Sequence, residues 1–348
     1  MLNSFTHTEK GIEFVARAIR RDKGQMRADV SIRLRGHELD RDEFRFSDRT
    51  KRNALANSAF ASIKGAETEV EHKERMQLLL RTFADLVEAQ WQQAIVVEDV
   101  KGLAEPESPP WVIRDYATEG AMTLLVGPPG IGKSWTGLLM AQSVACSVDT
   151  VFEVYEPQPV LYINLERSKR SLQNRLGMVN RVLGLPPTSE MPQINARGRS
   201  MGEITEAVMR HVEAEGTKFV VLDSLSRMGM GSMTQDDTAN EMMDTLNALR
   251  TATVVLGHTP RPQGQGAAAQ RQSEHVFGSQ MITAAADFEV ILKAKDGIGQ
   301  TLIGMKVKKA NDAPKAKLAG WLYQYGPAGL IAVSRSQYVS DEDFDEDA

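Results

Sequence analysis

The chain has little of what secreted and membrane-spanning proteins depend on. Its 348 residues include one cysteine, Cys146, so neither a disulfide framework nor a cysteine-based zinc cluster is expected. No apolar run approaches the ~18 residues that a membrane-spanning helix needs. The segment Met1 to Thr6 has neither the basic nor the apolar stretch of a signal peptide. We therefore expect a soluble, cytoplasmic protein that has no membrane partner.

Acidic residues only slightly outnumber basic ones, but the charges are unevenly distributed along the chain. The formal net charge is −5, and the last eight residues contain six acids. Residues 17–52 contain twelve Lys or Arg against seven acids. A basic front and an acidic tail are compatible with nucleic-acid binding, and also with a solvated surface and a disordered tail.

Hydrophobic patterning separates a small first domain from the rest. Residues 1–104 are expected to form an α+β domain. Met26 to Leu34 alternates polar and apolar residues as a half-buried strand does, and Glu69 to Gln93 repeats apolar residues at helical spacing. The proline-rich residues 105–110 are typical of an extended linker.

Residues 111–338 alternate strands with helices, which predicts an α/β domain with a mostly parallel sheet covered on both faces. Parallel strands are expected at Thr123–Val126, Val160–Asn164, Phe219–Leu222, Thr253–Leu256 and Phe288–Leu292. Helices are expected at Lys133–Ala145, Lys169–Leu183, Glu203–Glu213 and Asp237–Leu249. Short antiparallel strands are expected at Leu302–Val307, Trp321–Gln324 and Leu330–Val333, before a disordered acidic tail over 339–348.

The most informative stretch is Gly127 to Ser134, which matches G-x-x-x-x-G-K-[ST] without deviation. It lies between a β-prone apolar segment and an expected helix, as this pattern requires. The backbone N–H groups of such a loop point at phosphate oxygens, and the helix dipole adds to the attraction. Lys133 is expected to reach the β- and γ-phosphates of a nucleoside triphosphate, and Ser134 to ligate Mg²⁺. The predicted nucleotide-binding residues are Gly127, Pro128, Pro129, Gly130, Ile131, Gly132, Lys133, Ser134 and Trp135.

Two acids follow predicted strands. Asp223 ends the apolar run of Lys218 to Asp223, where its carboxylate can accept hydrogen bonds from magnesium-bound waters. No glutamate follows Asp223, so the group that activates water must come from elsewhere. Glu166 follows the strand Val160–Asn164, and would stand beside the γ-phosphate as a general base if that strand neighbours the P-loop strand. The alternatives are a turn cap for Asp223 and a helix-start acid for Glu166.

Four further candidates lie at or after the expected phosphate edge. His258 ends a strand at the edge where ligands bind in open α/β sheets, so it is either a γ-phosphate sensor or a capping or packing histidine. The segment Gln263 to His275 is long for a simple connection and is expected to be mobile. Arg261 lies just before this segment, and Arg271 and His275 lie within it. These three residues could contact nucleic-acid phosphates, and the alternative is a plain flexible loop.

Lys306 and Lys308 alternate onto one face at the end of a late strand. They could serve as a positive finger that reaches the γ-phosphate held by a neighbouring subunit. The alternative is a solvated basic strand end.

Together these residues resemble the RecA-like hexameric ATPases, in particular the RepA-type replicative helicases of plasmids and the related helicase-like AAA ATPases of phages. The resemblance extends from about Met122 to Asp312. It rests on the P-loop, Tyr-Ile-Asn-Leu-Glu ending at Glu166, Val-Leu-Asp-Ser-Leu-Ser-Arg at 221–227, the His258 strand, and Lys-Lys-Ala-Asn at 308–311.

The resemblance implies a RecA-like core, Mg²⁺ and ATP bound between the subunits of a homo-oligomeric, hexameric ring, and single-stranded DNA in its pore. It makes Glu166 the catalytic glutamate, Asp223 the magnesium-linked aspartate and His258 the sensor. In that family, the residue that reaches the γ-phosphate of the neighbouring subunit is usually an arginine. The candidates for this residue in the present chain are lysines.

The predicted function is that of an ATP-hydrolysing, DNA-dependent ring motor, a helicase or translocase, with residues 1–104 as a possible contact for a protein partner. One alternative is an ATPase that loads or remodels proteins, or mediates recombination, without unwinding. Another alternative is an ATP-gated nucleic-acid-binding module that hydrolyses little ATP. The expected position of Glu166 beside the attacking water is an argument against this alternative.

Overall fold

The computed structural model describes residues 4–22, 25–63, 70–93, 97, 99–102, 108–260, 276–336 and 339–344. The chain divides into two compact units, Met1–Ala104 and Glu105–Ala348. Residues 105–107, half of the expected linker, lie outside the described residues. In the described part of the chain, no helix is long and apolar enough to cross a membrane.

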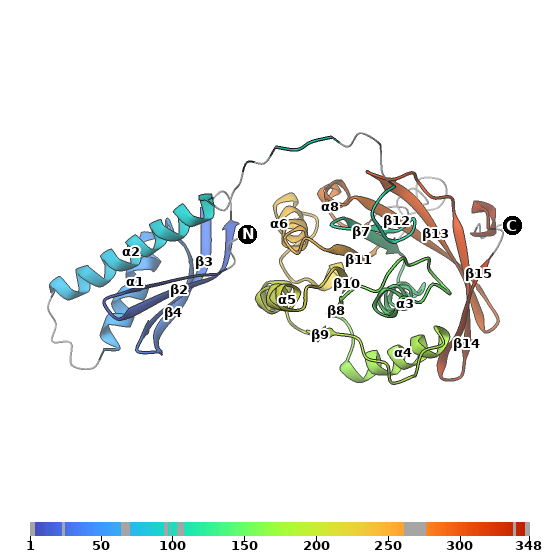
Figure 1. Ribbon diagram of the computed structural model, residues 1–348, viewed down its shortest axis with the longest axis horizontal. Coiled ribbons are helices and arrows are strands. Elements are labelled where there is room, and N and C mark those ends of the chain that lie inside the picture. The colour runs from blue at the N-terminus through green and yellow to red at the C-terminus, as the bar shows by residue number, and fades with distance from the viewer. Residues whose placement is uncertain are drawn as a thin grey trace. The chain divides into compact units, whose positions relative to one another are not determined.

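The first unit is a four-stranded antiparallel sheet followed by two helices. Its strands β1 (Ser4–Glu9), β2 (Ile12–Asp22), β3 (Gln25–Leu34) and β4 (His37–Arg45) pair in sequence order, and α1 (Arg49–Ala61) and α2 (Val70–Gln93) follow (Figure 1). Alternate residues of β2 and β3, such as Phe14 and Ile32, are fully buried, and Phe14 stacks on Phe83 of α2 with ring centroids 5.5 Å apart. This unit therefore has a core of its own.

The second unit is built on a nine-stranded sheet in the order β15-β14-β13-β12-β7-β11-β10-β8-β9. Its parallel part comprises β7 (Met122–Gly127), β11 (Ala252–His258), β10 (Phe219–Asp223), β8 (Val160–Asn164), β9 (Gln193–Asn195) and the start of β12 (Phe288–Gly297). The strands β13 (Gln300–Ala310), β14 (Ala319–Gly326) and β15 (Gly329–Ser336) extend it in antiparallel fashion. A short hairpin of β5 (Trp111–Ile113) and β6 (Ala117–Thr118) lies before β7.

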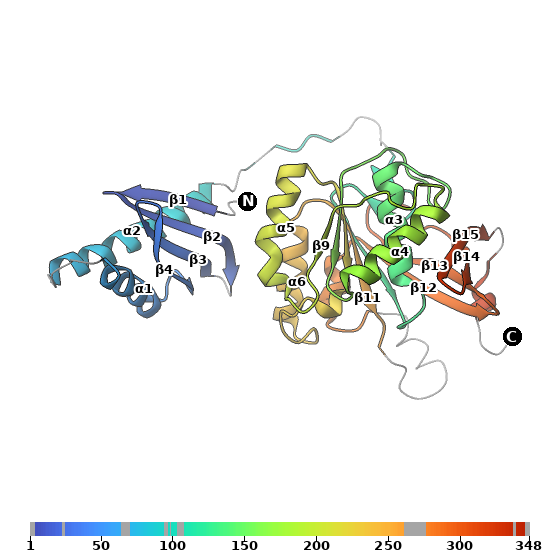
Figure 2. The same cartoon turned by 90° about the horizontal axis from the view of Figure 1, so that it is seen from below.

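Helices cover both faces of this sheet (Figure 2). On one face, α3 (Lys133–Cys146) and α4 (Lys169–Val182) share an apolar core with the strands, to which Leu138 and Leu172 belong. On the other face lie α5 (Met201–Glu215), α6 (Asp236–Asn247) and α8 (Gln280–Ala285), whose core includes Ile204 and Met242. Every residue of β8 and β10 is buried, as expected for strands covered on both faces.

The predicted α/β fold, with its parallel strands and its antiparallel end, is confirmed, and the arrangement is that of a RecA-like core. In the first unit the expected strand near 26–34 and helix near 69–93 are present as β3 and α2, whereas α1 has no counterpart among the predictions. Helix α1 begins at the N-cap Asp48, whose carboxylate accepts a hydrogen bond from Lys51 N at 3.1 Å.

The prediction of disorder from residue 339 is wrong for the part of the tail that the structure describes. Asp341–Phe344 forms a short 3₁₀ helix. Asp341 is held by ion pairs to lysines of β12 and β13, and Phe344 lies over Gly304, where the absence of a side chain makes room for the ring. These contacts come from residues far apart in the sequence, so the acidic composition of the tail does not reveal them.

Candidate functional site

The loop between β7 and α3 has the backbone that phosphate binding requires. Gly130 and Gly132 have φ angles of 89° and 98°, in the left-handed region that favours glycine. A Cβ at Gly132 would also come within 2.7 Å of Ile303 Cδ1 on β13. Helix α3 begins at Lys133, so its N-terminus closes the loop.

Lys133 lies inside the loop rather than in solvent. Its Nζ donates hydrogen bonds to the carbonyl oxygens of Gly127 at 2.8 Å and Pro128 at 2.7 Å. Burial lowers the pKa of Lys133 to about 8, while the negative charges of Asp223 and Glu166 oppose that shift. At neutral pH the ammonium is therefore charged and already positioned at the place where phosphates would bind.

Asp223 is buried at the end of β10, and two hydroxyl groups bind its carboxylate. Tyr162 of β8 donates to Oδ2 at 2.9 Å, and the Ser134 hydroxyl is also hydrogen-bonded to Asp223. Burial raises the pKa of Asp223, and these two hydrogen bonds oppose the shift. A hydroxyl and a carboxylate side by side are the hard oxygen groups that Mg²⁺ prefers, directly or through water.

Glu166 stands on a tight turn between β8 and α4. The buried Asn164 side chain accepts hydrogen bonds from the backbone N–H groups of Glu166 at 3.3 Å and Arg167 at 2.9 Å. It also donates to the Arg167 carbonyl at 2.8 Å. Helix α4 begins only after its N-cap Ser168. Glu166 therefore lies before the helix, on a turn that a buried side chain holds in place.

Strand β8 does not neighbour the P-loop strand β7, although the predicted place of Glu166 beside the γ-phosphate was conditional on that adjacency. Two strands, β11 and β10, lie between β7 and β8. Glu166 nevertheless reaches the phosphate loop, because Asp223 is in register with Asn164 on β8 and with Leu256 on β11. The parallel strands thus end at the same edge of the sheet, and the residues that follow each strand lie close together there.

One pocket at this edge collects most of the predicted residues. Its lining is Pro129, Gly130, Gly132, Lys133, Ser134, Trp135, Glu166, Arg167, Arg175, Asp223, Ser224 and His258. Burial lowers the pKa of His258, as do the nearby charges of Lys133 and Arg227, whereas Glu166 acts in the opposite direction. The imidazole is therefore neutral at pH 7.

The pocket fits a highly charged ligand. Two of its buried nitrogen atoms, His258 Nδ1 and Arg167 Nε, have no hydrogen-bond partner within the described residues. Such atoms are costly unless a ligand or water completes their hydrogen bonds. With the inward-facing Lys133 and the oxygen pair of Ser134 and Asp223, the residues present suit a nucleotide with Mg²⁺.

Four contributors to the site were not predicted from the sequence, and one of them, Ser224, directly follows Asp223. Tyr162 could have been suspected, because a tyrosine inside an otherwise apolar strand must find a partner for its hydroxyl. Arg167 directly follows Glu166. Arg175 has no local signal at all: its guanidinium lies 4.3 Å from the ring centroid of Trp135, on a different helix.

A second pocket adjoins the first and shares Trp135 and Arg175 with it. Its other lining residues are Ser168, Arg170, Ser171, Asn174, Met178, Ala328 and Gly329, contributed by the start of α4 and the turn between β14 and β15. Gly329 has a φ of 127°, and a Cβ there would come within 2.8 Å of Met178 Sδ. This glycine therefore allows the turn to approach α4 closely.

The remaining candidates lie elsewhere. Lys306 and Lys308 are on β13 and do not line either pocket. Glu289 lies opposite Lys309 and Val290 opposite Val307, so a bulge interrupts the expected alternation at Lys308. The candidates Arg261, Arg271 and His275 lie outside the described residues.

A phosphate loop between a buried strand and a helix, with a lysine, a serine and acids gathered at the sheet edge, defines a P-loop ATPase. The chain belongs to the AAA domain family, which it matches over residues 88–264. That segment contains the P-loop, Glu166, Asp223 and His258, and it ends before β13. No curated protein matches the chain.

Proposed function

We propose that this chain is an ATP-hydrolysing, DNA-dependent motor that works as a homo-oligomeric ring of the RepA helicase type, with single-stranded DNA as its track. The observation that supports catalysis is the convergence of Lys133, Asp223 and Glu166 on one pocket. The ring, its hexameric state and the DNA are proposals that rest on the resemblance of the sequence to those helicases.

The residues of the pocket have distinct proposed roles. The loop N–H groups and Lys133 bind the triphosphate, with Lys133 exchanging its two carbonyl partners for phosphate oxygens. Mg²⁺, held by Ser134 and Asp223, would neutralise the charge of the β- and γ-phosphates. Glu166 accepts a proton from the attacking water, and the neutral His258 hydrogen-bonds the γ-phosphate as a sensor.

The second pocket suits the nucleoside. Phosphates at Lys133 leave the ribose and base to extend away from the loop, and the adjoining pocket begins at the stacked pair of Trp135 and Arg175. This pair offers a flat, polarisable surface of the kind on which an aromatic base packs.

Two groups of residues would serve the ring. Lys306 and Lys308 are proposed as the finger that reaches the phosphates of a neighbouring subunit. The DNA backbone is the proposed contact of Arg261, Arg271 and His275, because its negatively charged phosphates attract basic side chains.

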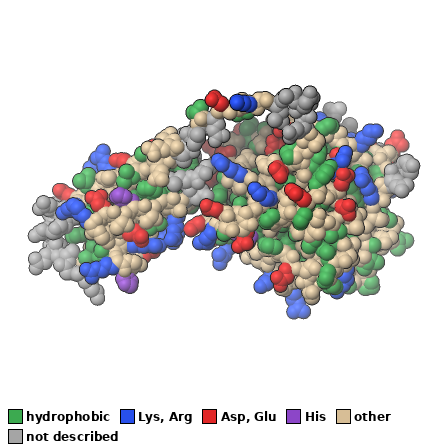
Figure 3. All heavy atoms as spheres, in the orientation of Figure 1, with side chains coloured by type: hydrophobic (Ala, Val, Ile, Leu, Met, Phe, Trp, Pro, Cys, Tyr) green, Lys and Arg blue, Asp and Glu red, His purple; other side chains and the backbone are tan. Residues whose placement is uncertain are grey.

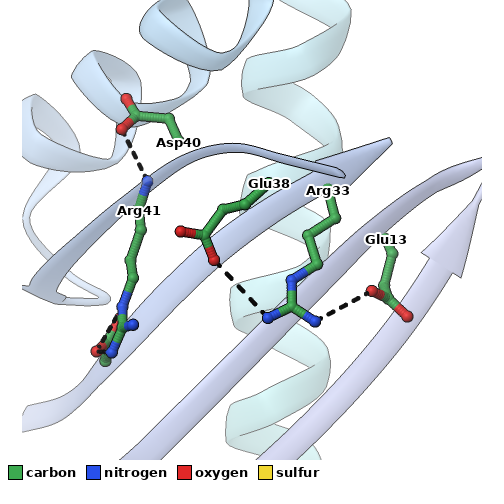
Figure 4. Close-up of polar contacts among 6 residues, drawn as sticks. Glu13, Arg33, Glu38, Asp40 and Arg41 are labelled. Carbon is green, nitrogen blue, oxygen red and sulfur yellow. Dashed lines mark hydrogen bonds and ion pairs between the residues drawn. The ribbon is translucent and has the colours of Figure 1, made fainter. Parts of the chain in front are cut away.

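A specific observation favours the alternative of a protein-directed loader or remodeller. Three arginines of the first unit's sheet, Arg27, Arg33 and Arg41, form ion pairs with acids of the same sheet, and acidic and basic side chains both lie on the face seen in Figure 3. Arg33 lies between Glu13 and Glu38, at 3.7 Å from each, and Arg41 Nε binds Asp29 at 2.6 Å (Figure 4). A mixed-charge face is better suited to a protein partner than to a phosphate backbone.

The test is steady-state ATP hydrolysis by the wild type and Glu166→Gln, with and without single-stranded DNA. We expect DNA to stimulate the wild type, and Glu166→Gln to retain ATP binding while hydrolysis falls by roughly 10²-fold or more, since a general base is lost. Light scattering should give a multimeric mass. Normal hydrolysis by Glu166→Gln would show that another residue is the base, and hydrolysis indifferent to DNA would favour the protein-directed alternative.

A further inference from the structure

The described part of the acidic tail docks on a basic face of the sheet. Asp341 Oδ1 accepts from Lys293 Nζ and Asp341 Oδ2 from Lys306 Nζ, each at 2.7 Å. Lys295 lies close enough to Asp343 for their charges to interact. The hydrogen bonds from Lys293 and Lys306 hold the pKa of Asp341 below its usual range. The carboxylate therefore stays ionised at neutral pH and keeps both lysines engaged.

Shape complementarity accompanies these charges. Phe344 lies over Gly304 and Val339 over Gly320, two glycines of the adjacent strands β13 and β14. Without a Cβ at either position, the sheet offers two shallow places for these apolar side chains. The contact is thus specific in both charge and shape, although Asp341 and Lys306 remain 50% and 39% exposed.

Lys306 lies on the face of β13 that is turned away from α3. Ile303 and Met305 belong to the core beneath α3, so Lys306, by the alternation of a strand, points to the opposite face of β13. Lys306 lies opposite Ile291 of β12, and Ile291 lies opposite Val126, the residue before the P-loop. It is therefore level with the phosphate edge of its own sheet, yet turned away from its own pocket.

We propose that Ser340–Phe344 is an autoinhibitory strap, in which Asp341 occupies Lys306 and must leave before Lys306 can meet the triphosphate held by a second copy of this chain. This inference rests on the proposed ring function. The Asp341 carboxylate binds Lys306 in the way that a phosphate would. It carries one negative charge, whereas a triphosphate carries several. Exposed ion pairs are weak, so a triphosphate delivered by an assembling neighbour can displace the strap.

Four single substitutions in the full chain separate the strap from the finger. Asp341→Asn removes the anion, and Lys293→Met removes only the supporting lysine. Lys306→Met removes both the anchor and the finger. Glu342→Gln is the matched control, because it removes one charge from the same segment, and the Glu342 side chain makes no hydrogen bond or ion pair within the described part of the chain.

Two readouts are needed. Hydrogen exchange of the amides of 339–344 reports docking without any need for catalysis. ATP hydrolysis against protein concentration reports assembly of the site. We expect Asp341→Asn and Lys293→Met to speed exchange and to shift half-maximal hydrolysis to lower protein concentration, by about fivefold for each exposed ion pair lost. Lys306→Met should also speed exchange but should hydrolyse less, and Glu342→Gln should match the wild type.

The possible failures are distinct. Unchanged exchange in Asp341→Asn would mean that these ion pairs do not hold the segment, which overturns the strap. Faster exchange with an unaltered concentration profile would mean that docking does not inhibit, which overturns the strap and leaves the motor function standing. If neither the wild type nor any variant hydrolyses ATP, the proposed function fails, and the strap fails with it.

Discussion

At the scale of single residues, the pocket is a set of coupled charges. Lys133 is buried beside two acids, Asp223 keeps its carboxylate between two hydroxyl groups, and His258 is kept neutral. Burial shifts the pKa of all three groups, downward for Lys133 and His258 and upward for Asp223. Removing one charge therefore alters the others, so substitutions here will not act additively.

The lowered pKa of Lys133 predicts a pH dependence of nucleotide binding. In the free protein this pKa is about 8. Bound phosphates would raise it, so the complex binds a proton that the free protein loses at higher pH. Affinity for ATP with Mg²⁺ should therefore be full below pH 8 and fall as pH rises through 8, by up to about tenfold per unit.

Isothermal titration in two buffers of different ionisation enthalpy checks this prediction. Proton uptake on binding should be small at pH 7.5 and approach one proton at pH 9.5. Lys133→Met serves as the control, since it should bind weakly without that uptake. An affinity that is constant over this range, with no proton uptake, would contradict the assignment of Lys133 to the phosphates.

At the scale of elements, the turn between β8 and α4 positions Glu166. The strand end, the buried Asn164 and the N-cap Ser168 together set where Glu166 stands. The P-loop is supported separately, by β7 and α3. With the proposed roles of these residues, binding and hydrolysis would depend on different elements, and a substitution is expected to affect one more than the other.

Asn164→Ala should expose this separation. The variant removes three hydrogen bonds of a buried side chain and leaves backbone groups of Glu166 and Arg167 without those partners. We expect stability to fall by about 1–3 kcal/mol, and kcat to fall at least tenfold by an order-of-magnitude estimate, with ATP affinity changed far less.

Ser200→Ala is a suitable control for Asn164→Ala. It breaks the capping box at the start of α5, away from the pocket, at a cost of about 1 kcal/mol. Denaturant unfolding measures both stabilities, and steady-state kinetics measure both activities. If the two variants lose kcat equally, general destabilisation rather than misplacement of Glu166 is the cause.

At the scale of the whole molecule, the two units have separate cores. Every residue that lines the two pockets belongs to the unit Glu105–Ala348, and the core of the first unit is built from its own sheet and helices. None of the described residues of the first unit lines either pocket, so a protein partner proposed for this unit need not contact the nucleotide site.

A fragment of residues 105–348 should therefore fold and bind ATP as the full chain does, with an affinity within about twofold. Equilibrium binding of a fluorescent ATP analogue to the fragment and to the full chain measures this, with Lys133→Ala in each as the negative control. A fragment that is folded by circular dichroism but binds tenfold more weakly would show that the first unit contributes to the pocket.

The sequence by itself determined the parts whose cause is local. The glycine pattern of the P-loop, the apolar runs of β8 and β10 and the periodicity of α2 are visible within short windows, because backbone conformation and strand burial depend on neighbouring residues. The ends of β8, β10 and β11 then indicated Glu166, Asp223 and His258 as candidates. The structure brings all three to one pocket, and their catalytic roles stay predictions.

Only the tertiary structure decided which segments meet. It separated β8 from β7 by two strands, set Tyr162 against Asp223, stacked Arg175 on Trp135 and docked Asp341 between two lysines. These partners are separated by tens of residues in the chain. Their contacts depend on sheet order and on which side of a strand a residue faces, and no local pattern encodes the choice of a distant partner.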